Sequence, residues 1–151
     1  MHHCSLIFCE RTGRWAAAWR QAWDRYARSG PHERAEIRTI ETRSPDGCLQ
    51  ELQEFPAAFV ILELAAEGCD RTLELLQEIA TRHRGAAAAV AAERAIQEYE
   101  WPLRELGAAH FIVSPRELPS LCRMVERHAA RSPRVELDLE ARIWASLPWG
   151  R

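Results

Sequence analysis

Short apolar runs alternate along the chain with segments in which apolar residues recur at helical spacing. The strongest run covers residues 57–64 and reads AAFVILEL, with no polar side chain before the acid near its end. A run without polar alternation is typical of a strand that is buried on both faces of a parallel sheet. Together with four other apolar or β-branched runs, it predicts five strands, at residues 5–9, 36–42, 57–64, 86–92 and 109–113.

The segments between these runs predict helices. In residues 14–28, Trp15, Trp19 and Trp23 recur every four positions, so they share one face while polar residues occupy the other. Such a stripe is either the core side of the helix or an interaction face. We favour the core, because no other residues of this helix can cover the sheet. Further helices are expected at residues 45–55, after Gly68-Cys69-Asp70, at 96–106 and at 117–130.

Several residues mark helix ends. Ser44 followed by Pro45 supplies an N-cap and a first-turn proline for the second helix. Pro102 is expected in or near the first turns of the fourth helix, where proline is tolerated. Gly107 ends that helix before the last strand.

Strict alternation of strands and helices predicts a single α/β domain. Helices between parallel strands must cross over the sheet, and right-handed crossovers place them on both faces. We therefore expect a three-layer, doubly wound, five-stranded parallel sheet in residues 1–131, followed by a tail in residues 132–151. Nearly all of the chain would then form one core.

The tail carries more apolar side chains than a linker needs. It is expected either to dock on its own domain or to enter a groove on a partner or a second copy, and the sequence leaves both open. Its deletion should leave the domain folded. The candidate interaction residues are Ile143, Trp144, Leu147 and Trp149.

Composition narrows the classes of partner. The net charge is −2, and the 20 basic residues, all arginines, are scattered among acids, which disfavours nucleic acid. No apolar run is long enough for a membrane span, and the first residues lack the pattern of a signal peptide, so we expect a cytoplasmic protein. The five cysteines show no metal-binding spacing and are expected to be free, mostly buried thiols.

Candidate chemistry lies at the strand ends, because the carboxyl ends of parallel strands meet at one edge of an open sheet. Glu63 ends the third strand, and Cys9 with Glu10 ends the first. Ala92 ends the fourth strand and Ser114 follows the fifth. Because the chain has no lysine, any mechanism that requires one is excluded.

Two segments combine an apolar strand with distinctive neighbours: residues 59–63 (FVILE), followed by LELL at 73–76, and residues 106–115 (LGAAHFIVSP). With these segments the sequence resembles a response-regulator receiver domain, a flavodoxin-like module of two-component signalling. The first segment resembles the strand that ends in the phosphorylated aspartate, and the second resembles the Gly-Ala before the last strand and the Lys-Pro after it. With the alternation of elements, the resemblance covers roughly residues 5–130.

The resemblance implies a set of active residues that this chain only partly retains. The family uses an acidic pair for magnesium, an aspartate that accepts phosphate, a hydroxyl and a lysine. The matching positions here are Cys9 and Glu10, Glu63, Ala92 and Ser114. Magnesium requires hard oxygen ligands, which a thiol does not supply.

We therefore interpret the chain as a non-catalytic pseudo-receiver, a signalling or adaptor module that works through protein–protein contacts and needs no cofactor or metal. Its surface would be the fourth helix, fifth strand and fifth helix, or the tail. Glu63 is either a fixed carboxylate in place of a phosphate or a strand-end acid bonded to backbone amides or paired with Arg11. The alternatives are a flavodoxin-like enzyme or small-ligand binder using the strand-end crevice and, more weakly, a receiver phosphorylated at an atypical residue.

Overall fold

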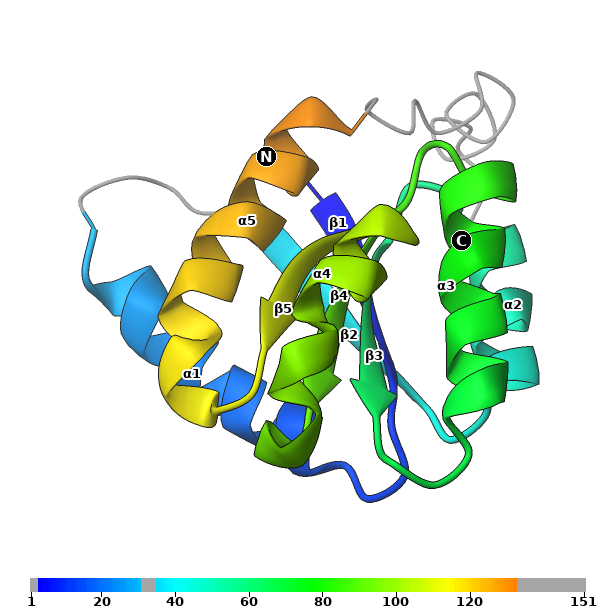
Figure 1. Ribbon diagram of the computed structural model, residues 1–151. Helices are drawn as coiled ribbons and strands as arrows, with labels where there is room; N and C mark the ends of the chain where they lie inside the picture. The colour runs from blue at the N-terminus through cyan, green and yellow to red at the C-terminus, as the bar shows by residue number, and fades with distance from the viewer. Residues whose placement is uncertain (1–2, 31–34, 133–151) are drawn as a thin grey trace, which may run out of the picture.

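Five parallel strands form the centre of the molecule in a computed structural model that describes residues 3–30 and 35–132. The strands lie in the order β2-β1-β3-β4-β5 (Figure 1). The predicted parallel sheet is confirmed, with each strand within two residues of its expected bounds. The observed strands are β1 (His3–Cys9), β2 (Glu36–Thr42), β3 (Phe59–Leu64), β4 (Ala87–Ala92) and β5 (Ala108–Ile112).

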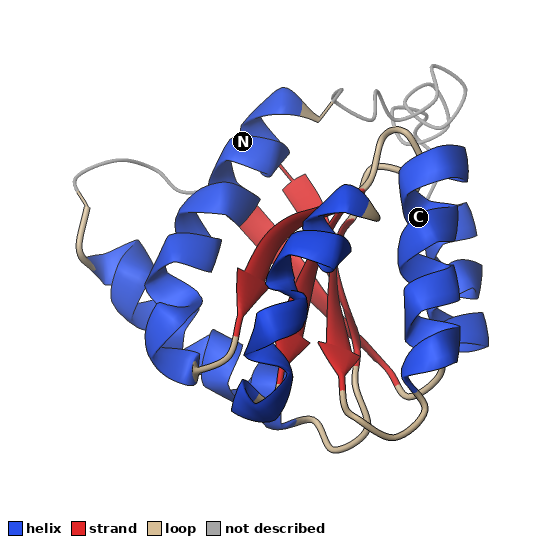
Figure 2. Cartoon of the chain, in the orientation of Figure 1, coloured by secondary structure: helices blue, strands red, loops and turns tan. Residues whose placement is uncertain are grey.

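Helices cover both faces of the sheet (Figure 2). One face packs against α1 (Arg14–Arg28) and α5 (Leu118–Arg131). The other packs against α2 (Pro45–Glu54), α3 (Cys69–Arg82) and α4 (Glu100–Glu105). The three-layer, doubly wound architecture expected from the alternation is therefore confirmed.

The fourth helix differs from its prediction. In place of one helix over residues 96–106, the chain forms a 3-10 helix, η1 (Arg94–Tyr99), followed by α4, with Ile96 outside helical geometry at φ −113° and ψ 19°. Pro102 supplies the reason. In a continuous helix its nitrogen would have to donate to the carbonyl of Glu98, and proline has no N–H. A second short 3-10 helix, η2 (Pro115–Glu117), precedes α5.

The tryptophan stripe of α1 is the core side of the helix, as favoured from the sequence. Trp15 and Trp19 are buried in the cluster between α1, α5 and the sheet, and Trp23 packs against that cluster while partly exposed. Trp19 and Trp23 stack with their ring centroids 5.4 Å apart. Because aromatic side chains bury a large apolar area, this stripe anchors α1 on the sheet.

The alanine-rich strand β4 shows how burial overrides helix propensity. It lies between β3 and β5, and Ala88, Ala89, Ala91 and Ala92 are all buried. Their small side chains let helices on both faces approach the backbone closely. None of the helices within residues 3–30 and 35–132 is both long and apolar enough to cross a bilayer.

Candidate functional site

The carboxyl ends of β1 and β3 border a cleft of about 330 Å³. These strands are neighbours in the sheet, although β2 lies between them in sequence, so the chain reverses its direction of winding here. Ligands of open α/β sheets bind at this kind of switch point. The residues that line the cleft include Cys9, Glu10, Arg11, Arg43, Glu63 and Arg71.

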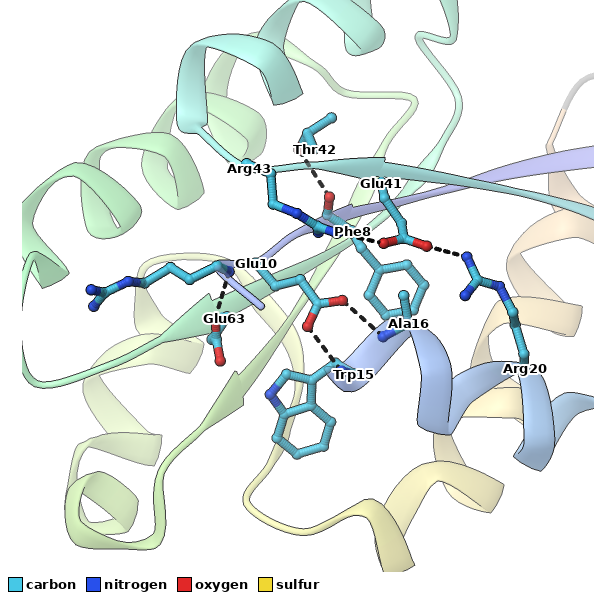
Figure 3. Close-up of polar contacts among 10 residues, drawn as sticks. Phe8, Glu10, Trp15, Ala16, Arg20, Glu41, Thr42, Arg43 and Glu63 are labelled. Carbon is cyan, nitrogen blue, oxygen red and sulfur yellow. Dashed lines mark hydrogen bonds and ion pairs between the residues drawn. The ribbon is translucent and has the colours of Figure 1, made fainter. Parts of the chain in front are cut away.

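Glu10 caps helix α1. The backbone N–H of Trp15 donates to its Oε2 atom and that of Ala16 to its Oε1 atom, each at 2.8 Å (Figure 3). The first N–H groups of a helix have no partner within the helix, and a carboxylate also matches the positive end of the helix dipole. Glu10 is only 3% exposed, so these two bonds account for both oxygens of a buried carboxylate. Both oxygens are thus turned toward α1.

Glu63 joins β3 to the start of α1. Its Oε2 atom accepts a hydrogen bond of 2.8 Å from the backbone N–H of Arg11, and its Oε1 atom lies 3.4 Å from Nε of Arg14 (Figure 3 draws the first contact). These contacts match the expectation of a strand-end acid bonded to a backbone amide, except that the ion pair is made by Arg14. The carboxylate thereby holds the β1–α1 loop against β3.

Cys9 lies at the end of β1 and is buried except for the part that lines the cleft. A hydrogen bond from the thiol of Cys48 lowers the pKa of Cys9, against the opposing effect of burial; Thr42 also lowers it, while the charges of Glu63 and Glu10 raise it. The structure confirms that four of the five cysteines are buried and that all are free. The effect of Cys48 on Cys9 was not evident from the sequence.

Ala92 and Ser114 do not line this cleft. Ala92 is buried and pairs with Leu64 across β3 and β4. The hydroxyl of Ser114 accepts a hydrogen bond from the Arg116 N–H at 3.3 Å, and Glu117 accepts the N–H of Ser114 at 2.9 Å. Ser114 therefore begins a capping box for η2. All five predicted positions lie at one edge of the sheet, and three of them share the cleft.

Three arginines on separate elements also line the cleft, and two of them pair with acids. Arg43 follows β2 and lies 2.8 Å from Glu41, which also contacts Arg20; these hydrogen bonds, from Arg43 first, hold the pKa of Glu41 below its usual value. Arg71 on α3 lies 2.8 Å from Asp46 of α2. Of the three arginines, only Arg11 was expected here from the sequence. Arg43 directly follows a predicted strand, whereas nothing in the sequence placed Arg71 here.

The polar groups that line the cleft are of different kinds. They include one thiol, carboxylates that already bond within the protein, and guanidinium groups. Within residues 3–30 and 35–132, no three His, Cys, Asp or Glu side chains are grouped closely enough to hold a metal ion.

Exposed aromatic side chains mark a second surface, on the segment between β4 and β5. Trp101 is 71% exposed and Tyr99 is 52% exposed, and both lie on the η1–α4 segment that precedes β5. The Trp101 indole donates to Oε1 of Glu105 at 3.1 Å. The predicted interaction residues Ile143, Trp144, Leu147 and Trp149 lie outside the described residues.

Comparison with known proteins finds likeness in structure alone. No protein-family model matches the sequence, and no curated protein matches it. A response regulator from Thermotoga maritima superimposes with a TM-score of 0.64 at 12% identity, over 85% of this chain and 98% of that chain. A DNA-binding response regulator of the LuxR family from Staphylococcus aureus gives 0.61 at 19% identity, over 83% and 98%. A response regulator receiver domain from Clostridium thermocellum gives 0.63 at 11% identity, over 85% and 95%.

These similarities define the class of fold. The sheet order matches that of flavodoxin-like proteins, in which the site lies between β1 and β3. At identities below 20%, these similarities show the fold alone. The chain has the receiver fold expected from the resemblance in sequence.

Proposed function

We propose that this chain is a non-catalytic pseudo-receiver, a signalling or adaptor module that works through protein–protein contacts and does not accept phosphate by magnesium-dependent chemistry. The observation that carries the proposal is the role of Glu10. Its two oxygens already accept the N–H groups of Trp15 and Ala16 at 2.8 Å. A magnesium ion that recruited this carboxylate would uncap α1 and leave buried donors unpaired.

The neighbouring groups fit magnesium poorly. Magnesium prefers oxygen ligands in near-octahedral geometry, and Cys9 supplies sulfur. Glu63 bonds to the Arg11 amide and pairs with Arg14, so a reaction at its oxygens would begin by breaking both contacts.

The remaining positions lack groups that would respond to a phosphoryl group. Ala92 offers no hydroxyl, and the Ser114 hydroxyl is used to cap η2. The chain contains no lysine to neutralise phosphoryl oxygens. Arg14 lies 3.4 Å from the Glu63 carboxylate, so this acid already has a cationic partner within the protein. This arrangement favours one fixed conformer.

Exposed aromatic residues support a role in protein contacts. Trp101 and Tyr99 expose more than half of their surface on the η1–α4 segment. Aromatic side chains are enriched at the energetic centres of protein interfaces. Their position fits the surface of fourth helix, fifth strand and fifth helix expected from the sequence.

The phosphorylation part of the proposal is tested with a small acyl phosphate donor and magnesium, followed by intact mass spectrometry. We expect no phosphoryl adduct under conditions that label a receiver domain with a complete acidic site. Stoichiometric phosphorylation of Glu63, or of any other residue at this edge, would contradict the proposal.

The contact part is tested by placing a photo-crosslinking amino acid at position 101 in cells. Position 24 serves as the matched control, because Asp24 is also exposed but lies on α1, across the sheet. We expect a discrete protein adduct, with a partner or a second copy of this chain, from position 101 only. Equal labelling from both positions, or none from position 101, would count against this surface.

A second function is favoured by one observation, the three guanidinium groups around the cleft. A small-ligand binder would use Arg11, Arg43 and Arg71 to hold an anion beside Cys9. Thermal unfolding in the presence of nucleotides, flavins and metal ions separates the two functions, since a ligand of the native state raises the midpoint. Strong stabilisation by one of them would favour the binder.

A further inference from the structure

A groove of about 570 Å³ lies between α1 and the η2–α5 segment. The two helices run side by side on one face of the sheet (Figure 1), and the Tyr26 hydroxyl on α1 donates to Oε2 of Glu126 on α5 at 2.6 Å. The apolar part of the groove comes from both sides, with Ala22 on α1 and with Pro115 and Pro119 on the η2–α5 segment. The groove is therefore an apolar surface between two helices that are fixed against each other.

The groove also carries positive charge. Arg25 of α1 and Arg116 of η2 line it, and among the described residues neither guanidinium has an acidic partner. Arg123 and Arg127 follow Pro119 by one and two turns, so they lie on the same face of α5, and both are exposed. The groove therefore suits an occupant that combines apolar side chains with acidic ones.

The sequence that follows α5 has this combination. Residues 135–140 read VELDLE, so apolar and acidic residues alternate. In an extended segment, successive side chains point to opposite sides, whereas in a helix the same alternation would spread both kinds around the axis. The apolar side of the extended segment would hold Val135, Leu137 and Leu139, and the acidic side Glu136, Asp138 and Glu140. The alternation therefore predicts an extended segment with one apolar and one acidic side.

The end of α5 lies within reach of the groove. Ser132 has extended geometry, at φ −60° and ψ 132°, and a proline follows it, so the helix ends there. With its 14 residues, α5 is about 21 Å long. Residues 133–140, when extended, span about 26 Å. A chain that turns back after Ser132 can thus run along the whole of α5 as far as Arg116.

We propose that residues 135–140 dock in extended form in the groove between α1 and α5 of the same chain. Their apolar side packs on the alanine and the prolines of the groove, and their acids pair with the arginines along it. The groove between α3 and the η1–α4 segment is a poorer match, because its lining residues include no cation. Since exposed ion pairs contribute little, docking adds little to the stability of the domain. The inference is independent of the proposed function, because it concerns another surface and is measured without a partner.

The test uses the lack of lysine in the chain. In the full chain, Arg116→Lys places a single side-chain amine in the groove. A water-soluble carbodiimide then activates carboxyl groups, an amine within reach forms an amide bond with one of them, and the reagent leaves as a urea. We expect the intact mass of the single chain to fall by one water, and peptide mapping to link position 116 to an acid within residues 135–140.

Arg71→Lys is the matched control. Arg71 lies on α3, which packs on the other face of the sheet, and its guanidinium is 2.8 Å from Asp46 and 3.0 Å from Glu74. The reagent should link position 71 to these neighbours and not to residues 135–140. The proposal is overturned if position 116 gives no link to residues 135–140 while position 71 links to its neighbours. It is also overturned if the link from position 116 occurs only in a covalent dimer.

Two changes in the Arg116→Lys background test the fit while keeping every acid of the segment. Leu137→Ser combined with Leu139→Ser removes most of the apolar side and should lower the yield of the link, whereas Leu147→Ser, outside the segment, should not. Arg25→Glu should lower the yield at least about twofold, because it reverses one charge of the groove. Arg82→Glu makes the same charge change on α3 and should leave the yield unchanged. An unchanged yield in the double serine variant would mean that the acids reach position 116 without docking, and the proposal would fall.

Discussion

Oε2 of Glu10 lies 2.8 Å from the backbone nitrogen of Trp15, and the same carboxylate accepts the next N–H, from Ala16. Glu10, which directly follows β1, thus caps the helix that begins at Arg14. The contact fixes the start of α1, whose tryptophans fill the core on that face of the sheet. The Glu10 side chain therefore both lines the cleft and stabilises the start of α1.

Replacing Glu10 by glutamine should lower the free energy of unfolding by about 1–3 kcal/mol, because the amide group keeps only one acceptor oxygen for two N–H groups near the helix dipole. Urea unfolding followed by circular dichroism measures the loss. Glu74→Gln is the matched control, since Glu74 is exposed on α3 and its pair with Arg71 contributes little. If both variants unfold at the same urea concentration, the cap does not stabilise α1 as argued.

Gly107→Ala should destabilise the protein more than Gly68→Ala. Both glycines have positive φ, at 110° and 74°, so either substitution strains the backbone by about 1–2 kcal/mol. At Gly107 the new Cβ would also lie 2.4 Å from Cβ of Ala80, whereas at Gly68 it meets nothing within 4 Å. We expect the overlap to add about 1–3 kcal/mol, measured by urea unfolding. Equal losses would show that α3 moves away at no cost.

His110 should make stability depend on pH. Burial, followed by the charge of Arg104, lowers its pKa in the folded state, while Glu117 and Glu100 act more weakly in the opposite direction. Its Nε2 atom lies 3.0 Å from the hydroxyl of Ser120, which itself donates to the Glu117 carbonyl at 2.6 Å. The neutral ring therefore donates from Nε2 to Ser120.

Protonation of His110 should destabilise the folded protein, because its pKa is lower in the folded state than in the unfolded chain. Below about pH 6.5 the unfolded chain binds a proton at His110 more readily than the folded chain does. The contribution of His110 to the free energy of unfolding is therefore fully present above that pH and decreases as the pH falls. Between about pH 7.5 and 5.5, the wild type should lose more stability than His110→Gln. Urea midpoints of both proteins at the two pH values measure the difference. Parallel losses would assign the dependence to other groups.

Deleting residues 133–151 should leave the unfolding midpoint nearly unchanged. Residues 3–30 and 35–132 contain all five strands of the sheet and both buried clusters. Because folding free energy comes largely from apolar burial, the truncated chain keeps its main stabilising contacts. Thermal and urea unfolding of the two chains test this, and failure of the shorter chain to fold would show that residues 133–151 form part of the core.

The sequence alone predicted the sheet and its helices because their signals are local. The run at 57–64 has no polar alternation, Ser44 and Pro45 begin a helix, and the tryptophans at 15, 19 and 23 recur at helical spacing. Each pattern depends on residues within one element, where period and capping preferences apply directly. The split between η1 and α4 was not predicted. Pro102 is tolerated only in the first turn of a helix, so the α-helix begins at Glu100 and the residues before it form a separate 3-10 helix.

Only the tertiary structure decided what the strand-end residues do. The strand pattern places Cys9, Glu10 and Glu63 at one edge of the sheet, but their partners depend on side-chain directions and on contacts between distant segments. Glu63 bonds to an amide 52 positions away, and Cys48 on α2 lowers the pKa of Cys9. Glu10 turns toward α1 because its buried carboxylate needs hydrogen-bond donors and the first N–H groups of α1 need an acceptor. Folding alone brings the two together.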